Sequence, residues 1–248
     1  MNNKLNIVVI IACNILLSGT LAMAGKGFVD NFEGPTLNKA WSEKNGLNCK
    51  GLEYKKPLKG SFEISSLTDT NPAKLNVVSY SMQRSFEKIN GDFTATMDLN
   101  WNQMGVSGMT SVKIAVLSSD GKVLSSAGMV DGWIAGYAKM FGSVGKKEIT
   151  GMAIPDKSSA KLKIERTGEN YTIKFREFIV LIAKGSTQDI ASVKILVKFI
   201  DYPPYKKYAE SHFGVITIDK IAIIQKQKYI KKLNNKELQK QTINVDVD

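Results

Sequence analysis

Aromatic side chains gather in two segments of this sequence, around residues 133–137 and 202–208. Sugar rings have apolar faces that stack on aromatic rings, whereas their hydroxyl groups need planar polar partners. The candidate stacking residues are Trp133, Tyr137, Tyr202, Tyr205 and Tyr208, and the candidate polar partners are Asp131, Asn100 and Arg84. These residue types are those of a carbohydrate-binding site, so the elements that carry them decide whether they meet.

Two of the tryptophans have structural interpretations to weigh against ligand binding. Trp101 is in phase with the alternating apolar residues of 93–99, so we expect it in the core. Trp133 follows the glycine-containing stretch 128–132, and both a core position and display on a loop remain open for it.

Nucleophilic chemistry has few candidates. Cys13 and Cys49 are the cysteines, and His212 is the one histidine. Cys49 as a nucleophile would require His212 as its base, although the two are far apart in sequence. The simpler interpretation is a small residue in a loop or at a strand end.

The first 24 residues have the layout of a secretory signal peptide. Lys4 precedes an apolar run from Leu5 to Leu17, and Ala22-Met23-Ala24 is an A-x-A cleavage signal before Gly25. The run is too short to favour a membrane-spanning helix, so we expect no transmembrane anchor in the mature chain and a periplasmic or extracellular location. An alternative is that Cys13 is the lipidated residue of a lipobox, although the chain after it remains apolar.

The charge balance is strongly basic, with 34 Lys and Arg against 23 Asp and Glu among 248 residues, a formal net charge of +11. Such a surface attracts polyanions without choosing among them. Export and the absence of an aromatic-basic binding motif argue against nucleic acid. The lysine-rich stretch 225–248 is expected to be a solvated tail, with binding to an anionic glycan or lipid as the alternative.

Between residues 25 and 224 the sequence predicts one all-β domain. The segment 160–175 alternates apolar and polar residues on both sides of Thr167-Gly168-Glu169-Asn170, which is typical of a β-hairpin with one dry and one wet face. The segment 93–101 alternates in the same way. Further strands are expected at 52–54, 61–64, 73–80, 82–86, 111–117, 122–125, 134–140, 149–154, 178–183, 192–200 and 213–224. Many short strands with turn signals between them indicate an antiparallel β-sandwich or jelly roll.

Three motifs in this order resemble the concanavalin A-like lectin/glucanase superfamily, which includes laminin-G-like domains and laminarinase-type hydrolases. The opening FVDNFEG at 28–34, with Leu37 and Trp41, is similar to its F-x-D-x-F-x-G…L…W pattern. The second motif is KLKIERTG at 161–168 with Tyr171, and the third is FGV at 213–215 with IDKI at 218–221. The resemblance implies a jelly roll of two antiparallel sheets that commonly holds carbohydrate on its concave face.

The sequence departs from the enzymes of that superfamily. Laminarinase-type hydrolases carry E-x-D-x-x-E on one strand, whereas the carboxylates here are dispersed. Those considered are Glu63, Asp69, Asp98, Asp131 and Glu165. A polysaccharide lyase would need Tyr or His beside a residue that neutralises a carboxylate, and no such cluster is recognisable.

The resemblance also implies a structural Ca²⁺ between the opening segment and the closing strand, which would place Glu33 and Asp219 at the metal. The function that the sequence favours is a secreted, non-catalytic domain that binds a polysaccharide or glycan, with an acidic glycan among the candidates. The alternatives are a diverged glycoside hydrolase or polysaccharide lyase of the same fold, or a structural protein of the envelope or surface.

Overall fold

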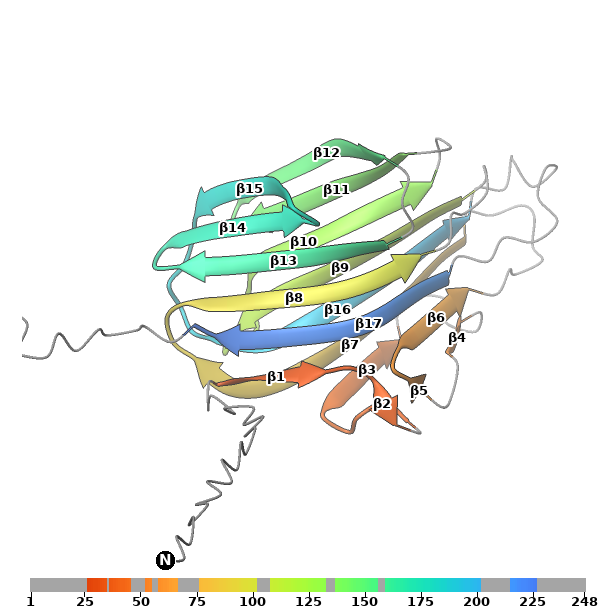
Figure 1. Cartoon of the computed structure of the whole chain (residues 1–248), viewed down its shortest axis with the longest axis horizontal. Helices are drawn as coiled ribbons and strands as arrows, with labels where there is room; N and C mark the ends of the chain where they lie inside the picture. Colours follow the sequence, from red (N-terminus) through yellow and green to blue (C-terminus); the bar gives the residue numbers. More distant parts are fainter. Residues whose placement is uncertain are drawn as a thin grey trace, which may run out of the picture.

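The protein is a sandwich of two antiparallel β-sheets in a computed structural model that describes residues 26–34, 36–45, 52–54, 58–66, 76–101, 108–132, 137–155, 159–201 and 215–226. Figure 1 shows the two sheets stacked face to face. Within these residues no helix is long and apolar enough to cross a membrane. The predicted all-β jelly roll is confirmed.

The first sheet has eight strands. In spatial order they are β15 (Phe178–Lys184), β14 (Asn170–Phe175), β13 (Ser159–Thr167), β8 (Phe93–Trp101), β17 (Val215–Gln225), β6 (Phe62–Ser66) and β4 (Leu52–Tyr54), and β1 (Gly27–Asp30) also pairs with β17. The hairpin of β13 and β14 turns at Gly168, whose φ of 58° is easily adopted by glycine.

The second sheet has seven strands. In spatial order they are β12 (Lys147–Pro155), β11 (Tyr137–Val144), β10 (Val123–Gly132), β9 (Gly108–Ser118), β16 (Ile190–Asp201), β7 (Asn76–Ile89) and β3 (Trp41–Asn45). A separate two-stranded sheet joins β2 (Glu33–Gly34) to β5 (Leu58–Lys59).

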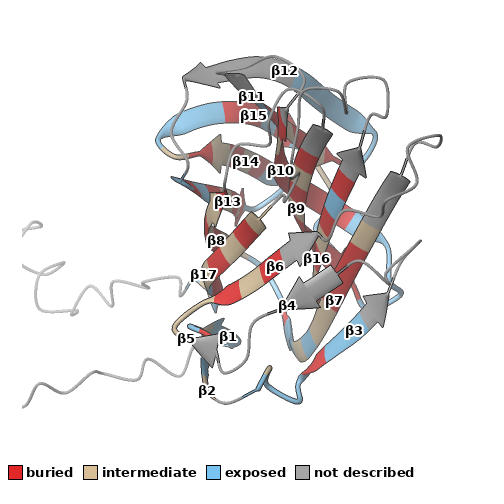
Figure 2. Ribbon diagram, turned by 90° about the vertical axis from the view of Figure 1, so that its right-hand side faces the viewer, coloured by how far each residue is buried: buried red, intermediate tan, exposed pale blue. Residues whose placement is uncertain are grey.

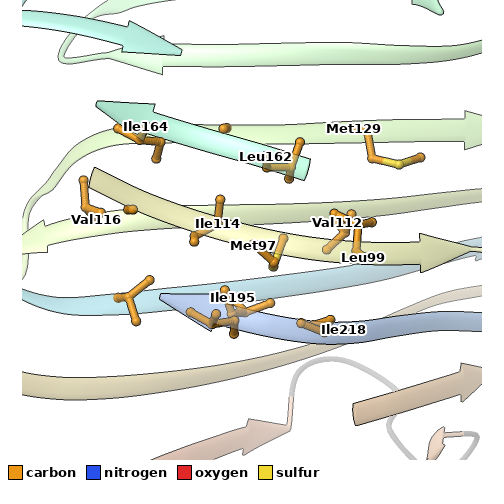
Figure 3. Close-up of a cluster of buried hydrophobic side chains, with 14 of the residues drawn as sticks. Met97, Leu99, Val112, Ile114, Val116, Met129, Leu162, Ile164, Ile195 and Ile218 are labelled. Atoms are coloured by element: carbon orange, nitrogen blue, oxygen red, sulfur yellow. The ribbon is translucent and has the colours of Figure 1, made fainter. Parts of the chain in front are cut away.

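The core lies between the two sheets because strand alternation sends every second side chain inward. Along β8 the side chains are alternately buried and half-buried from end to end. Figure 2 shows the buried positions recurring along strands of both sheets. Figure 3 shows Met97, Leu99 and Leu162 of the first sheet meeting Ile114 and Ile195 of the second.

Four expectations about strand boundaries were wrong in detail. The predicted strands 73–80 and 82–86 are one strand, β7, because Ser81 continues the pairing with β16 opposite Leu196. The strand expected at 122–125 continues as β10 to Gly132, and the one expected at 134–140, described from Tyr137, continues to Val144 and turns into β12 at Gly145. Gln225, expected in the tail, ends β17 opposite Phe93.

Two apolar strands carry exposed side chains. On β16, Lys198 of the face opposite the core is exposed and Lys194 is half-buried. The strand β15 lies at the edge of its sheet, where Phe178, Ile179 and Ile182 are all more than half exposed. Hydrophobicity alone did not distinguish these edge positions from buried ones.

Candidate functional site

The strand registers show which side chains lie side by side on the outer face of the seven-stranded sheet. Residues of β9 such as Val112 and Ile114 are buried in the core, so their neighbours point outward. The outward residues, in rows that cross the strands, are Lys139, Val130, Ser111, Lys198 and Ser79; Phe141, Gly128, Lys113, Leu196 and Ser81; and Ser143, Ser126, Ala115, Lys194 and Gln83. This face is polar and basic, with one aromatic ring.

Phe141 lies flat on this face because Gly128 makes room for it. A Cβ added to Gly128 would lie 2.2 Å from Cζ of Phe141 and 2.6 Å from the carbonyl oxygen of Val112. The Lys113 ammonium lies 6.0 Å from the centre of the same ring. Phe141 is half-buried, so part of its ring remains available to a ligand. An aromatic ring beside hydrogen-bonding groups is the arrangement that sugar recognition uses.

Lysines on the two outer faces of the sandwich differ in their partners. On the eight-stranded sheet, Lys163 and Lys174 pair with Glu165 at 2.8 Å and 3.1 Å, and Lys161 pairs with Asp98 at 3.4 Å. On the seven-stranded sheet, none of the four lysines Lys113, Lys139, Lys194 and Lys198 forms an ion pair with a described residue. The second face therefore has uncompensated positive charge.

On the described residues of that face, carboxylates are absent from the central strands, whereas Glu148 of the edge strand β12 lies on it, paired with Ser143. No Asp or Glu occurs in β9 or β11, and the outward positions from Ser192 to Lys198 of β16 and from Ser79 to Ser85 of β7 have none either. Asp131 of β10 is turned inward. Paired-carboxylate hydrolysis of a glycosidic bond needs two such groups on one face, so these strands do not supply that chemistry.

Arg84, a candidate ligand partner from the sequence, is occupied inside the sandwich. Its Nη1 donates to Oδ2 of Asp30 at 2.9 Å, and its guanidinium lies 4.0 Å from the centre of the Phe28 ring. The same Oδ2 accepts a hydrogen bond from Nε1 of Trp41 at 2.8 Å. These contacts join β1, β3 and β7.

Asp131 and Trp101 bond to each other across the two sheets. Nε1 of Trp101 donates to Oδ2 of Asp131 at 2.7 Å, and both side chains are buried. The expectation that Trp101 lies in the core is confirmed. Asp131 was predicted from the sequence to bind a sugar hydroxyl. In the structure its carboxylate oxygen instead accepts a hydrogen bond from Trp101.

Asn100 and Asp219 lie together on the outer face of the eight-stranded sheet. Nδ2 of Asn100 donates to Oδ2 of Asp219 at 2.5 Å. Burial raises the pKa of Asp219, the nearby Asp98 raises it further, and the bond from Asn100 opposes both.

The calcium ligands that the resemblance implied do not form a cluster in the described residues. Glu33 is exposed on β2, which pairs with β5, whereas Asp219 accepts a hydrogen bond from Asn100. No group of three His, Cys, Asp or Glu side chains among the described residues could hold a metal ion. Glu33 and Asp219 as calcium ligands, together with backbone carbonyls, therefore stay a prediction from the resemblance.

The aromatic candidates fall largely outside the described residues. Trp133, Tyr202, Tyr205 and Tyr208 lie there, as do Cys13, Cys49, His212, residues 1–25 and residues 227–248; Tyr137 begins β11. The strand ends beside two of these aromatics are well defined. Gly132 is paired with Met109 and Asp201 with Gly108, so β10 and β16 end on either side of β9. Trp133 and Tyr202 thus follow strand ends about 10 Å apart.

Among the described carboxylates, Glu165 forms the most ion pairs, with Lys163, Lys174 and Lys226. Burial raises its pKa, but hydrogen bonds from Lys163 and Lys174 and the charges of Lys163 and Lys226 outweigh this and lower the pKa to about 2. All of these groups lie on the outer face of the eight-stranded sheet. The arrangement is an ion-pair network that holds β13, β14 and the end of β17 together.

This network predicts an acid-dependent loss of stability. Because the pKa of Glu165 in the folded protein, about 2, lies below its ordinary value of 4.5, the stabilisation is complete above pH 4.5 and is lost as the pH falls toward 2. We expect Glu165→Gln to lower the free energy of unfolding at pH 7 by about 2 kcal/mol and to flatten its decline below pH 4.5. Urea unfolding from pH 7 to pH 2 measures this. Glu169→Gln, which removes an exposed pair with Lys184, is the control, and equal pH profiles for the two variants would contradict the prediction.

Comparisons with known proteins support the fold. No protein-family model matches the sequence, and no curated protein shows significant similarity to it. Among solved structures, the chain is similar to the CBM2 module of the evolved Dit protein of Lactobacillus casei BL23 phage J-1, with a TM-score of 0.55 and 11% identity over 83% of this chain and 98% of that one. It is also similar to a Bacillus licheniformis β-glucanase, with a TM-score of 0.52 and 12% identity over 82% and 99%.

A third similar structure is the GlcNAcα1-4Gal-releasing endo-β-galactosidase of Clostridium perfringens, with a TM-score of 0.55 and 12% identity over 80% of this chain. The match spans 62% of that enzyme, which is less than two thirds of its length. At these identities the comparisons show the fold alone, a sandwich of two antiparallel β-sheets.

Phe141, Gly128 and the three lysines at 113, 194 and 198 were not predicted from the sequence as a group. The alternation of lysines in 192–200 was a signal that one face of this strand is polar. What placed Lys113 beside that face was the pairing of β9 with β16, which local sequence does not encode.

Proposed function

We propose that this protein is an exported, non-catalytic carbohydrate-binding domain whose ligand lies on the outer face of the seven-stranded sheet. The observation that supports this best is the Phe141 ring, supported by Gly128 and flanked by Lys113, one of four lysines on this face that form no ion pair with a described residue. The three proteins of similar fold include a carbohydrate-binding module and two enzymes that act on glycans. A periplasmic or extracellular location follows from the leader-like N-terminus.

The ligand would extend from this face toward the ends of β10 and β16. Trp133, Tyr202, Tyr205 and Tyr208 are the proposed further stacking residues, together with Tyr137 at the start of β11. Asp131, Asn100 and Arg84 are left out of the proposed contacts, since their polar atoms already bond within the protein.

Affinity electrophoresis of the purified protein through gels containing neutral or acidic polysaccharides tests the proposal, with reducing ends assayed in the same samples. We expect retardation without new reducing ends. Released reducing ends would instead identify a hydrolase or lyase. If no gel shows retardation and no product is released, a structural surface protein would be favoured.

A pair of matched phenylalanine variants tests the site. We expect Phe141→Ser to weaken binding about 5- to 20-fold, because the ring loses its stacking contact with the sugar. Phe178→Ser is the control, since Phe178 is 53% exposed on β15 of the other sheet and should leave affinity unchanged. Trp133→Ala and Tyr205→Ala test the proposed extension to the loops. Equal affinities for the parent and Phe141→Ser would place the ligand elsewhere.

A further inference from the structure

The uncompensated lysines on the outer face of the seven-stranded sheet have a regular spacing. Lys194 and Lys198 project from β16 four residues apart, and Leu196 between them is paired with Lys113 on β9. Their Cα atoms are therefore about 13 Å apart along the strand, with Lys113 about 7–8 Å from each. The lysines form a shallow triangle over two neighbouring strands.

A fourth lysine extends the same surface. Lys139 is paired with Val130, Val130 with Ser111, and Ser111 with Lys198, so Lys139 and Lys198 share one row across four strands. Three strand spacings separate them by about 14 Å. No single small anion spans these distances, whereas a chain with repeated negative groups would reach several lysines at once.

The residues between the lysines include the apolar Leu196 and Val130, but short side chains with hydroxyl or amide groups also stand there. Ser111 and Ser81 stand beside Lys198 and Leu196, and Gln83 beside Lys194 donates through Nε2 to Oγ of Ser192 at 3.2 Å. Ion pairs hold Lys161, Lys163 and Lys174 of the opposite face in place, but the lysines here form no ion pair with a described carboxylate. An unpaired set of like charges repels itself and is relieved by an anionic partner.

We propose that the ligand of this face is an anionic polysaccharide, whose sulfate or carboxylate groups are bound by Lys113, Lys194 and Lys198 while a sugar ring stacks on Phe141. This specificity rests on the proposed carbohydrate-binding function and adds the charge class of its ligand. Serine hydroxyls and the Gln83 amide are suited to the sugar hydroxyls between the charged groups.

Two triple variants of the whole chain test the charge class. The first is Lys113→Gln/Lys194→Gln/Lys198→Gln. The control is Lys161→Gln/Lys174→Gln/Lys220→Gln, which removes the same charge from the outer face of the eight-stranded sheet. The probes are dextran, dextran sulfate and polygalacturonate, with laminarin as a further neutral glycan. Isothermal titration at two salt concentrations gives affinity and its salt dependence, and circular dichroism confirms that both variants fold.

We expect the parent to bind dextran sulfate or polygalacturonate at least tenfold more tightly than dextran or laminarin. The first triple variant should lose about tenfold or more of that affinity and much of its salt dependence, whereas the control should lose less than about threefold. The comparison of dextran sulfate with polygalacturonate distinguishes sulfate from carboxylate recognition.

Other results would overturn the inference in distinguishable ways. Binding of laminarin or dextran as tight as binding of the charged probes, unchanged in the first variant, would remove the anionic specificity but leave the carbohydrate-binding proposal standing. Equal losses in the two triple variants would show a general charge effect instead of a site. A DNA duplex bound as tightly as polygalacturonate would show a surface for any polyanion, and no binding of any probe would contradict both proposals.

Discussion

Arg166→Met is expected to lower the free energy of unfolding by about 3 kcal/mol, because it removes the hydrogen bonds that a fully buried guanidinium donates to two carbonyl groups. Arg166 is fully buried at the start of the β13–β14 turn. Its guanidinium donates to the carbonyl oxygen of Gly91 and, at 2.5 Å, to that of Gln188. It also lies 4.8 Å from the centre of the Phe93 ring. One side chain thus ties the turn before β8 to the segment before β16.

Methionine has nearly the volume of arginine but no hydrogen-bond donors. The decrease in the free energy of unfolding therefore reports the lost hydrogen bonds more than a cavity. Arg166→Lys retains the charge without the planar fork, and we expect it to lose about 2 kcal/mol. Urea unfolding followed by tryptophan fluorescence gives both values. Arg176→Met is the matched control: this half-buried arginine donates to the carbonyl oxygen of Ser159, and its loss should cost less than about 1 kcal/mol. Equal costs for Arg166→Met and Arg176→Met would show that burial of Arg166 is not what matters.

The sequence predicted the elements that are governed by local alternation. The strand 93–101 was placed at the bounds that the structure gives, because its apolar residues alternate without a break from Phe93 to Trp101. The hairpin of β13 and β14 was predicted for the same reason, with Arg166 on the apolar side. That an arginine could occupy this side became clear only from the carbonyl groups that surround it.

The candidate site depended on pairing between distant segments, which the sequence does not display. Lys113 and Leu196 are adjacent through the β9–β16 register, although 83 positions separate them in the chain. Phe141 rests on Gly128 through the β10–β11 pairing. Residue type suggested Arg84 as a ligand partner, but its environment is set by Asp30, which is 54 positions away. Long-range contacts therefore decided which polar residues are free to bind a ligand.

The contact between Asp30 and Arg84 gives the second large effect. Asp30 accepts three hydrogen bonds: from the backbone N–H of Phe32 at 2.9 Å, from Nε1 of Trp41 and from Nη1 of Arg84. Phe32 has a φ of 54°, which a non-glycine residue adopts at a cost, and the bond to Asp30 offsets that cost. Both charged side chains are at most 15% exposed. We therefore expect Asp30→Ala to lower the free energy of unfolding by about 3 kcal/mol.

A double-mutant cycle separates the ion pair from the other bonds of Asp30. Arg84→Met should cost about 2 kcal/mol, and the double variant should cost about 1–2 kcal/mol less than the sum, because removal of Asp30 already leaves Arg84 unpaired. Glu87→Ala is the control, because Glu87 pairs with Lys26 in the same part of the sandwich. The side chains of Lys26 and Glu87 are 43% and 70% exposed, so this ion pair should contribute little to stability. Polysaccharide affinity of folded Arg84→Met completes the test. Unchanged affinity is expected if Arg84 serves the fold, whereas lost affinity with unchanged stability would return Arg84 to the ligand site that its residue type first suggested.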